Sequence, residues 1–170
     1  MDYIIHCKRF EELSLLELYR ILQIRNQVFY VEQHCDDLDL DDKDQESLHL
    51  TIYDGEILVA YARLLPPGLS YPEMSVGRVA VSASYRGRQI GRLLMDQSIE
   101  YLEARYGKGA IKISAQRYLE QFYRSLGFQT ISEVYMEAGI EHLKMLRPSA
   151  DSRVKQRTQN APGSSTQEKP

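Results

Sequence analysis

The sequence contains no tryptophan, only two cysteines and no long apolar run. Cys7 and Cys35 are too few for a disulfide framework, and we expect both to be free thiols in a reducing cytoplasm. No segment approaches the roughly 20 apolar residues that span a bilayer, and no basic stretch precedes an apolar run at the N-terminus, so we expect neither a membrane anchor nor a secretion signal. A zinc site would need more Cys or His at short spacing, so we expect no metal.

Basic charge is also scarce. The chain carries 24 acidic residues against 21 Lys and Arg, a net charge of −3. Four of the bases but only two of the acids lie after residue 147, so residues 1–147 are more acidic than the whole chain. An acidic body argues against nucleic acid as the main partner and is compatible with a cationic amine substrate.

The 170 residues suit one domain, and their pattern alternates between strand and helix. We expect strands over 3–8, 48–53, 56–65, 74–81, 110–115, 131–137 and 140–145, and helices over 14–30, 90–106 and 119–126. Ser14 and Glu17 have capping-box spacing, and Asp54-Gly55 is typical of a hairpin turn. The pattern predicts an α/β protein (α+β-type mixed sheet) over residues 1–147. After Pro148 the composition turns polar, which predicts a disordered tail over 148–170.

Seven acids crowd into residues 36–46. A calcium-binding loop is excluded, because no Gly stands at the sixth position and no Glu at the twelfth if Asp37 or Asp39 is the first. A solvated acidic loop is the favoured interpretation. An electrostatic collar for a cationic substrate is the alternative.

Residues 77–94 carry the most informative pattern, a strand, a short turn and the start of a long helix. A helix N-terminus presents unpaired N–H groups and the positive end of the helix dipole, which together bind anions. Gly87 and Gly91 allow a phosphate to approach the backbone closely, and Arg86, Arg88 and Arg92 add positive charge. We expect a pyrophosphate here, with a basic turn that merely contains structural glycines as the alternative.

Two common pyrophosphate motifs do not fit this stretch. Residues 91–93 read Gly-Arg-Leu where a P-loop has Gly-Lys-Ser/Thr, and Gln89 follows Gly87 at the place where a dinucleotide fingerprint has its second glycine. The stretch instead resembles motif A of the GNAT superfamily, Arg/Gln-x-x-Gly-x-Gly/Ala, with Arg86 first and Gly91 last. Gln89 replaces the usual glycine. Its backbone N–H can still donate to the pyrophosphate if residue 89 avoids a glycine-only conformation.

Residues 116–128 independently resemble motif B of the same superfamily. Tyr123 and Gly127-Phe128 match at the right spacing, whereas Gln116 replaces the usual Asn. Residues 25–35, 60–64 and 77–79 are in turn similar to the ElaA-type GNATs. Together these matches cover roughly residues 3–147.

The resemblance implies the GNAT acyl-CoA N-acyltransferase fold, a central twisted mixed β-sheet with helices on both faces and a splayed pair of middle strands. It implies that acetyl-CoA is bound by residues of the strand, the turn and motif B, namely Val79, Ala80, Val81, Arg86, Gly87, Arg88, Gln89, Ile90, Gly91, Arg92, Gln116 and Tyr123.

The resemblance also implies an N-acetyltransferase in which an amine attacks the thioester directly within a ternary complex. The backbone N–H of Val79 or Val81 would stabilise the oxyanion, and a bulge in this strand would leave such an N–H unpaired. Tyr123 would protonate the leaving thiolate, since a phenol pKa of about 10 suits a thiol. For the base, Glu32 is the first candidate, followed by His142 and Glu137, with a water chain as a further alternative.

Three functions follow from these residues. The first is acetyl transfer from acetyl-CoA to a primary amine of a small molecule or peptide, in the cytoplasm, without nucleic acid or membrane as partner; a homodimer is compatible with it. The second is a catalytically weak CoA-binding regulatory module, which the departures at Gln89 and Gln116 keep open. The third is a same-fold synthase that uses another acyl donor.

Overall fold

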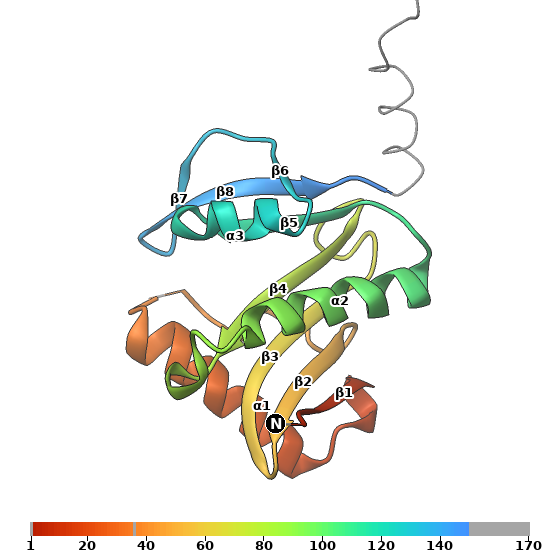
Figure 1. Cartoon of the computed structure of the whole chain (residues 1–170), viewed down its shortest axis with the longest axis vertical. Coiled ribbons are helices and arrows are strands. Elements are labelled where there is room, and N and C mark those ends of the chain that lie inside the picture. The colour runs from red at the N-terminus through yellow and green to blue at the C-terminus, as the bar shows by residue number, and fades with distance from the viewer. Residues whose placement is uncertain (1, 36, 150–170) are drawn as a thin grey trace, which may run out of the picture.

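The computed structural model describes residues 2–35 and 37–149 (Figure 1). Its strands are β1 (Ile4–Arg9), β2 (Leu48–Asp54), β3 (Ile57–Leu65), β4 (Met74–Val81), β5 (Ile111–Gln116), β6 (Gln129–Thr130), β7 (Tyr135–Glu137) and β8 (Ile140–Arg147). Its α-helices are α1 (Leu15–Arg25), α2 (Ile90–Tyr106) and α3 (Glu120–Ser125). The remaining helical segments are the 3₁₀ turns η1 (Phe10–Glu12), η3 (Ala83–Tyr85) and η4 (Arg117–Leu119) and the π-helix η2 (Asn26–Glu32).

Helix α1 begins at the predicted capping box. The Ser14 hydroxyl accepts from the backbone N–H of Glu17 at 3.2 Å, and the Glu17 carboxylate accepts from the backbone N–H of Ser14 at 2.9 Å. The helix expected over 14–30 is present, but it is a regular α-helix only as far as Arg25, after which the chain continues as the π-helix η2. Such π-type turns are frequent at functional sites.

The sheet is mixed and opens at its centre. The strand order is β1-β2-β3-β4-β5-β8-β6, with β7 also paired to β8, and every neighbouring pair is antiparallel except β4 and β5. The parallel strands β4 and β5 pair only at Met74↔Ile111 and Ser75↔Lys112 before they separate (Figure 1). The predicted mixed sheet with a splayed middle pair is therefore confirmed.

Helices cover both faces of the sheet, because alternate residues of β3 point in opposite directions. Ala60, Ala62 and Leu64 join the larger core, together with apolar residues of α2 and α3. Tyr61, between them, joins the smaller core against Ile21 of α1. The predicted helices on both faces are thus confirmed, and α2 and α3 share one face.

Among residues 2–35 and 37–149, no helix is both long enough and apolar enough to cross a bilayer. Within the same residues, no three Cys, His, Asp or Glu side chains are grouped so that they could hold a metal ion. The disordered tail expected over 148–170 lies outside the described residues except for Pro148 and Ser149.

Candidate active site

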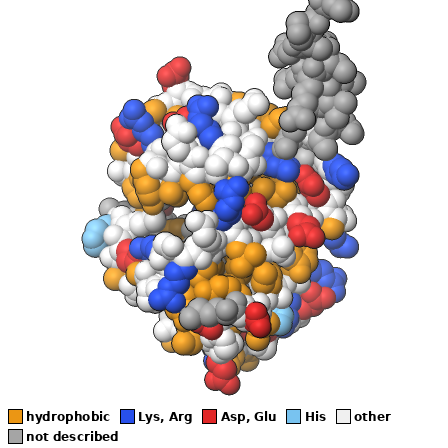
Figure 2. All heavy atoms as spheres, viewed as in Figure 1, with side chains coloured by type: hydrophobic (Ala, Val, Ile, Leu, Met, Phe, Trp, Pro, Cys, Tyr) orange, Lys and Arg blue, Asp and Glu red, His pale blue; other side chains and the backbone are white. Residues whose placement is uncertain are grey.

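A cleft of about 1460 Å³ opens where β4 and β5 separate. Figure 2 shows the surface hollowed between the part built from β5, β8 and α3 and the part built from β1–β4, with Lys and Arg side chains at the edge. Most of the predicted site residues line this cleft, namely Glu32, Val79, Val81, Arg86, Gly87, Gln89, Ile90, Gly91, Arg92, Gln116, Tyr123 and His142.

Two predicted binding residues, Ala80 and Arg88, do not contribute side chains to that lining. The Ala80 side chain is buried in the small core with Tyr61, because it points to the opposite face of β4 from its neighbours. The Arg88 guanidinium lies 4.9 Å from the ring centre of Tyr85. Any contact of Ala80 with a ligand in the cleft would have to come from its backbone.

The turn between β4 and α2 contains two residues with left-handed backbone. Gly87 has φ 77° and Gln89 has φ 64°. Residue 89 thus avoids a glycine-only conformation, because the left-handed helical region is open to other residues at a cost. A residue with a side chain pays roughly 1–2 kcal/mol to occupy this region, so the turn that begins α2 is strained at Gln89.

The N-terminus of α2 keeps its backbone donors free of side-chain caps. Gln89, the N-cap residue, makes no side-chain cap, and the first turn contains no acidic residue. A Cβ at Gly91 would lie 3.9 Å from Val81 Cγ2 and 4.0 Å from Phe122 Cζ, which is ordinary contact. Since packing does not require a glycine there, its value is the open approach to the backbone, as an anion site needs.

The arginines of the turn already have partners. The Arg86 guanidinium donates to the Glu32 carboxylate at 2.5 Å and to the backbone oxygen of Val81 at 3.1 Å. Arg92 donates to the Ser125 hydroxyl at 2.9 Å. Both arginines are about half exposed at the edge of the cleft, so an anion can still approach them. The ion pair between Arg86 and Glu32 joins the turn to the end of η2.

Strand β4 carries a bulge beside the cleft. Tyr61 pairs with Ala80, and Arg63 pairs with Gly77, so two residues of β4, Arg78 and Val79, stand against one residue of β3. Arg78 has φ 53°, a conformation that costs a side-chain-bearing residue roughly 1–2 kcal/mol. The bulge lies in the strand to which the sequence resemblance assigns the oxyanion donor.

Tyr123 is buried in the cleft wall. It is 6% exposed and meets the rings of Phe122 and Phe128 edge-on, with centroids at 5.1 and 5.9 Å. Burial, with a smaller effect of Tyr118, raises the pKa of the Tyr123 phenol, so the group is protonated at neutral pH. The expected match between its pKa and that of a thiol is correspondingly weaker. Tyr118 is 72% exposed, so the two tyrosines differ clearly in burial.

The three candidate bases lie in different surroundings. Glu32 forms an ion pair with Arg86, so its carboxylate already has a partner at the edge of the cleft. His142 is 8% exposed, and its Nδ1 lies 2.8 Å from the backbone oxygen of Ile140. Because a carbonyl oxygen can only accept, that contact makes Nδ1 the donor and leaves Nε2 able to accept a proton.

Glu137 lies close to His142 on the same hairpin. Its carboxylate accepts from the Ser114 hydroxyl at 2.7 Å. Burial alone would raise the pKa of Glu137, but the hydrogen bond from Ser114 and the charges of His142 and Lys144 lower it overall. Glu137 is therefore an anion at neutral pH.

The acidic loop is not simply solvated, contrary to the favoured interpretation. Asp44 is only 7% exposed and accepts from Arg25 at 2.9 Å and from Arg63 at 3.0 Å. Both arginines are almost completely buried. Although burial by itself would raise the pKa of Asp44, the charges and hydrogen bonds of these two arginines lower it. The loop is thus fastened to α1 and β3.

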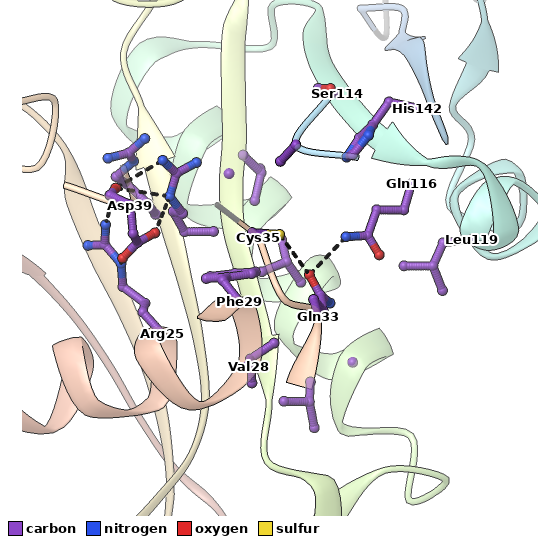
Figure 3. A pocket seen from close by; sticks show the side chains of 18 of the residues that line it. Arg25, Val28, Phe29, Gln33, Cys35, Asp39, Ser114, Gln116, Leu119 and His142 are labelled. Carbon is purple, nitrogen blue, oxygen red and sulfur yellow. Dashed lines mark hydrogen bonds and ion pairs between the residues drawn. The ribbon is translucent and has the colours of Figure 1, made fainter. Parts of the chain in front are cut away.

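One further contact, which the sequence did not indicate, joins the two walls of the cleft. Gln116 Nε2 on β5 donates to the side-chain oxygen of Gln33, just after η2, at 3.0 Å, and Cys35 Sγ lies 4.0 Å from the same oxygen (Figure 3). In the same view Ser114 and His142 lie beyond Gln116, and Arg25 and Asp39 lie on the opposite side. The cleft is therefore bordered by η2, the loop after it, β4, β5 and β8.

A splayed mixed sheet with an uncapped helix N-terminus at the opening is the architecture that the sequence resemblance implies, and comparisons with known proteins agree. Residues 22–147 match the acetyltransferase (GNAT) domain family. The protein ElaA of Escherichia coli is 39% identical over 138 residues, which cover 80% of this chain and 90% of that protein. An uncharacterised N-acetyltransferase of Bacillus subtilis, YjcF, is 31% identical over 127 residues, 73% of this chain and 87% of that protein.

Solved structures give the same result. An acyl-CoA N-acyltransferase from Pseudomonas aeruginosa superimposes with a TM-score of 0.82 at 35% identity, over 86% of this chain and 99% of that chain. The crystal structure of Escherichia coli ElaA gives a TM-score of 0.81 at 35% identity, over the same shares. The chain therefore belongs to the GNAT acetyltransferase family and to its ElaA-like branch.

A CoA-dependent acyl-homoserine lactone synthase, BjaI, has a TM-score of 0.73 at 15% identity, over 99% of this chain and 95% of that chain. At this identity the likeness concerns the fold alone.

Proposed function

We propose that the protein transfers an acetyl group from acetyl-CoA to a primary amine of a small molecule or peptide, by direct attack within a ternary complex. One observation carries the proposal: the uncapped N-terminus of α2, the bulged strand β4 and the buried phenol of Tyr123 all border the same cleft. An anion site, a source of backbone donors and an acid are the three elements that acyl transfer from a CoA thioester needs.

The pyrophosphate of the donor would bind at the turn formed by residues 86–91 and at the first turn of α2. Gly87 and Gly91 leave the backbone accessible, and Arg86 and Arg92 stand at the edge. Val79 and Val81 would line the arm that carries the thioester, as they line the cleft. A backbone N–H at the β4 bulge would donate to the oxyanion as the amine nitrogen bonds to the carbonyl carbon.

Tyr123 would stabilise the sulfur as the C–S bond breaks. Because burial raises its pKa, the phenol retains its proton at neutral pH and is available as a hydrogen-bond donor. We assign it the role of general acid, with hydrogen-bond donation to the thiolate as the main contribution.

The attacking amine must be neutral, although a free alkylamine has a pKa of about 10.4. We assign the proton acceptor to His142 rather than to Glu32, since Nε2 of His142 is left able to accept while Glu32 is paired with Arg86. The anionic Glu137 beside it would stabilise the imidazolium that forms. We also propose a cytoplasmic location, since two cysteines in 170 residues are too few for the disulfide framework of a small secreted domain.

Release of free thiol from acetyl-CoA, measured over a panel of primary amines, tests the proposal. We expect turnover with at least one amine and its loss in Tyr123→Phe. Binding of CoA without thiol release from any amine would indicate a regulatory module instead. Turnover with a longer acyl-CoA but none with acetyl-CoA would indicate a synthase that uses another donor.

A further inference from the structure

Arg78 occupies an unusual place in β4. It is the first of the two residues that form the bulge, and its φ of 53° lies in the region that side chains disfavour. A conformation of this kind persists only where the surroundings hold it. The contacts of the Arg78 side chain therefore indicate what fixes the shape of the bulge.

Those contacts all lead to the acidic loop. Arg78 Nε donates to Asp39 Oδ1 at 2.6 Å, and Nη2 donates to the Asp39 backbone oxygen at 2.9 Å. A weaker contact at 3.5 Å joins Nη2 to Asp41. A guanidinium that binds one residue through two nitrogens is fixed in direction as well as in distance.

Asp39 is in turn held from the opposite side. Its other carboxylate oxygen accepts from Nε of Arg25 at 2.8 Å, and its backbone oxygen accepts from Nη2 of Arg25 at 3.0 Å (Figure 3). Arg25 is 1% exposed at the end of α1. Asp39 thus lies between two arginines, Arg25 from the end of α1 and Arg78 from the bulge.

The strand opposite the bulge is tied to the same loop. Arg63 of β3, which pairs with Gly77, donates to Asp41 at 2.5 Å and to Asp44 at 3.0 Å. His49 of β2 contacts the backbone oxygen of Asp44 at 3.0 Å through Nε2. Three arginines and three aspartates therefore join α1, β3 and β4 through a single loop.

We propose that Arg78 and Asp39 are positioning residues, which hold the β4 bulge so that its backbone donor faces the thioester carbonyl. This inference rests on the proposed acetyl transfer. It also replaces the alternative that the acidic loop attracts a cationic substrate. Asp39, Asp41 and Asp44 are already paired with three arginines, so they add little attraction for a second cation.

A purely stabilising ion pair and a positioning pair make different predictions for two substitutions at residue 78. Arg78→Ala and Arg78→Gly both remove the guanidinium. Glycine adopts a positive φ freely, whereas alanine disfavours it, so the glycine variant can keep the bulge without the ion pair. If the ion pair only stabilises the fold, both variants keep the wild-type kcat.

The experiment measures kcat, KM and CoA affinity for both variants with the best amine. We expect kcat to fall by roughly 10- to 100-fold in Arg78→Ala and by only a few-fold in Arg78→Gly, with CoA affinity nearly unchanged in both, because misplacement of about 1 Å can cost 100-fold. Arg147→Ala is the matched control. It breaks the 2.6 Å pair with Glu103 outside the cleft and is expected to lower the melting temperature without changing kcat.

A wild-type kcat in both the alanine and the glycine variant would overturn the inference and leave the proposed function intact. A wild-type protein that releases no thiol with any amine would overturn the proposed function and this inference with it. If Arg78→Ala does not fold, Arg78→Asn takes its place; its kcat is expected below that of Arg78→Gly, because asparagine enters the left-handed region less freely than glycine. A wild-type kcat in the asparagine variant would count equally against the inference.

Discussion

Gln116 on β5 donates a hydrogen bond of 3.0 Å to Gln33, and this contact joins the two walls of the cleft across its opening. A neutral hydrogen bond of this kind contributes about 0.5–1.5 kcal/mol. In a double-mutant cycle of Gln33→Ala and Gln116→Ala, we expect a coupling of that size in the free energy of unfolding, measured by urea denaturation. Additive effects would mean that the two side chains do not interact in solution.

Tyr123→Phe removes only the phenol oxygen and keeps the ring between Phe122 and Phe128. We expect kcat to fall by roughly 10²- to 10⁴-fold while CoA affinity stays level, because the lost interaction forms in the transition state. Tyr118→Phe is the comparison, since that side chain is 72% exposed and should have little effect. Wild-type turnover by the Tyr123 variant would leave Tyr123 as a packing residue.

Gly91→Glu tests the anion site at the N-terminus of α2. A glutamate adds negative charge where we propose that the pyrophosphate binds, so CoA affinity measured by calorimetry should fall by at least tenfold, about 1.4 kcal/mol. Gly91→Ala separates charge from bulk: its Cβ would meet Val81 and Phe122 at ordinary contact distances, so the fold is kept and CoA affinity should fall less than with glutamate. Unchanged affinity in a folded glutamate variant contradicts the assignment.

Gln89→Gly should stabilise the protein. Gln89 has φ 64° and makes no capping hydrogen bond with its side chain, so glycine removes strain without removing a cap. The expected gain in unfolding free energy is about 1 kcal/mol, somewhat reduced by the greater entropy of glycine in the unfolded chain. Thermal denaturation of the two proteins measures it, and a lower melting temperature for the variant would show that the Gln89 side chain makes a favourable contact.

Stability should fall at acid pH because of the aspartate–arginine network. Burial alone would raise the pKa of Asp41, but the hydrogen bond and charge of Arg63 and the charge of Arg78 lower it. A folded pKa below the unfolded value of about 3.9 gives stability that is present above about pH 4 and is lost as the pH falls further. Asp41→Asn should therefore show a shallower loss of stability below pH 4 than the wild type, measured by denaturation at several pH values.

Local signals in the sequence predicted the elements that depend on few neighbours. The Ser14 cap, the Asp54-Gly55 hairpin and the bounds of β4 and α2 all agree with the structure. These features are determined by side chains within a few residues of one another, and for that reason a single sequence suffices to find them.

The candidate site could be predicted less completely from the sequence, because its contacts join segments that are distant along the chain. Asp39 and Arg78 are 39 residues apart, and Glu32 and Arg86 are 54 residues apart. The acid-rich loop therefore reads as solvated until the arginines that cover it are known. A signal was nevertheless present: Arg63 interrupts an apolar strand, and a charge in such a strand needs a buried partner.

The separation of β4 from β5 also has a thermodynamic consequence. Only two residue pairs connect these strands, so the segment from β5 to β8 is joined to the rest of the sheet less extensively than β1, β2 and β3 are to one another. A ligand that fills the cleft contacts both parts and binds only when both are folded and docked. By mass action it adds RT ln(1 + [L]/Kd) to the stability of the docked state. With the proposed donor as that ligand, the acyl-CoA pool of the cell would enter the folding equilibrium of this chain.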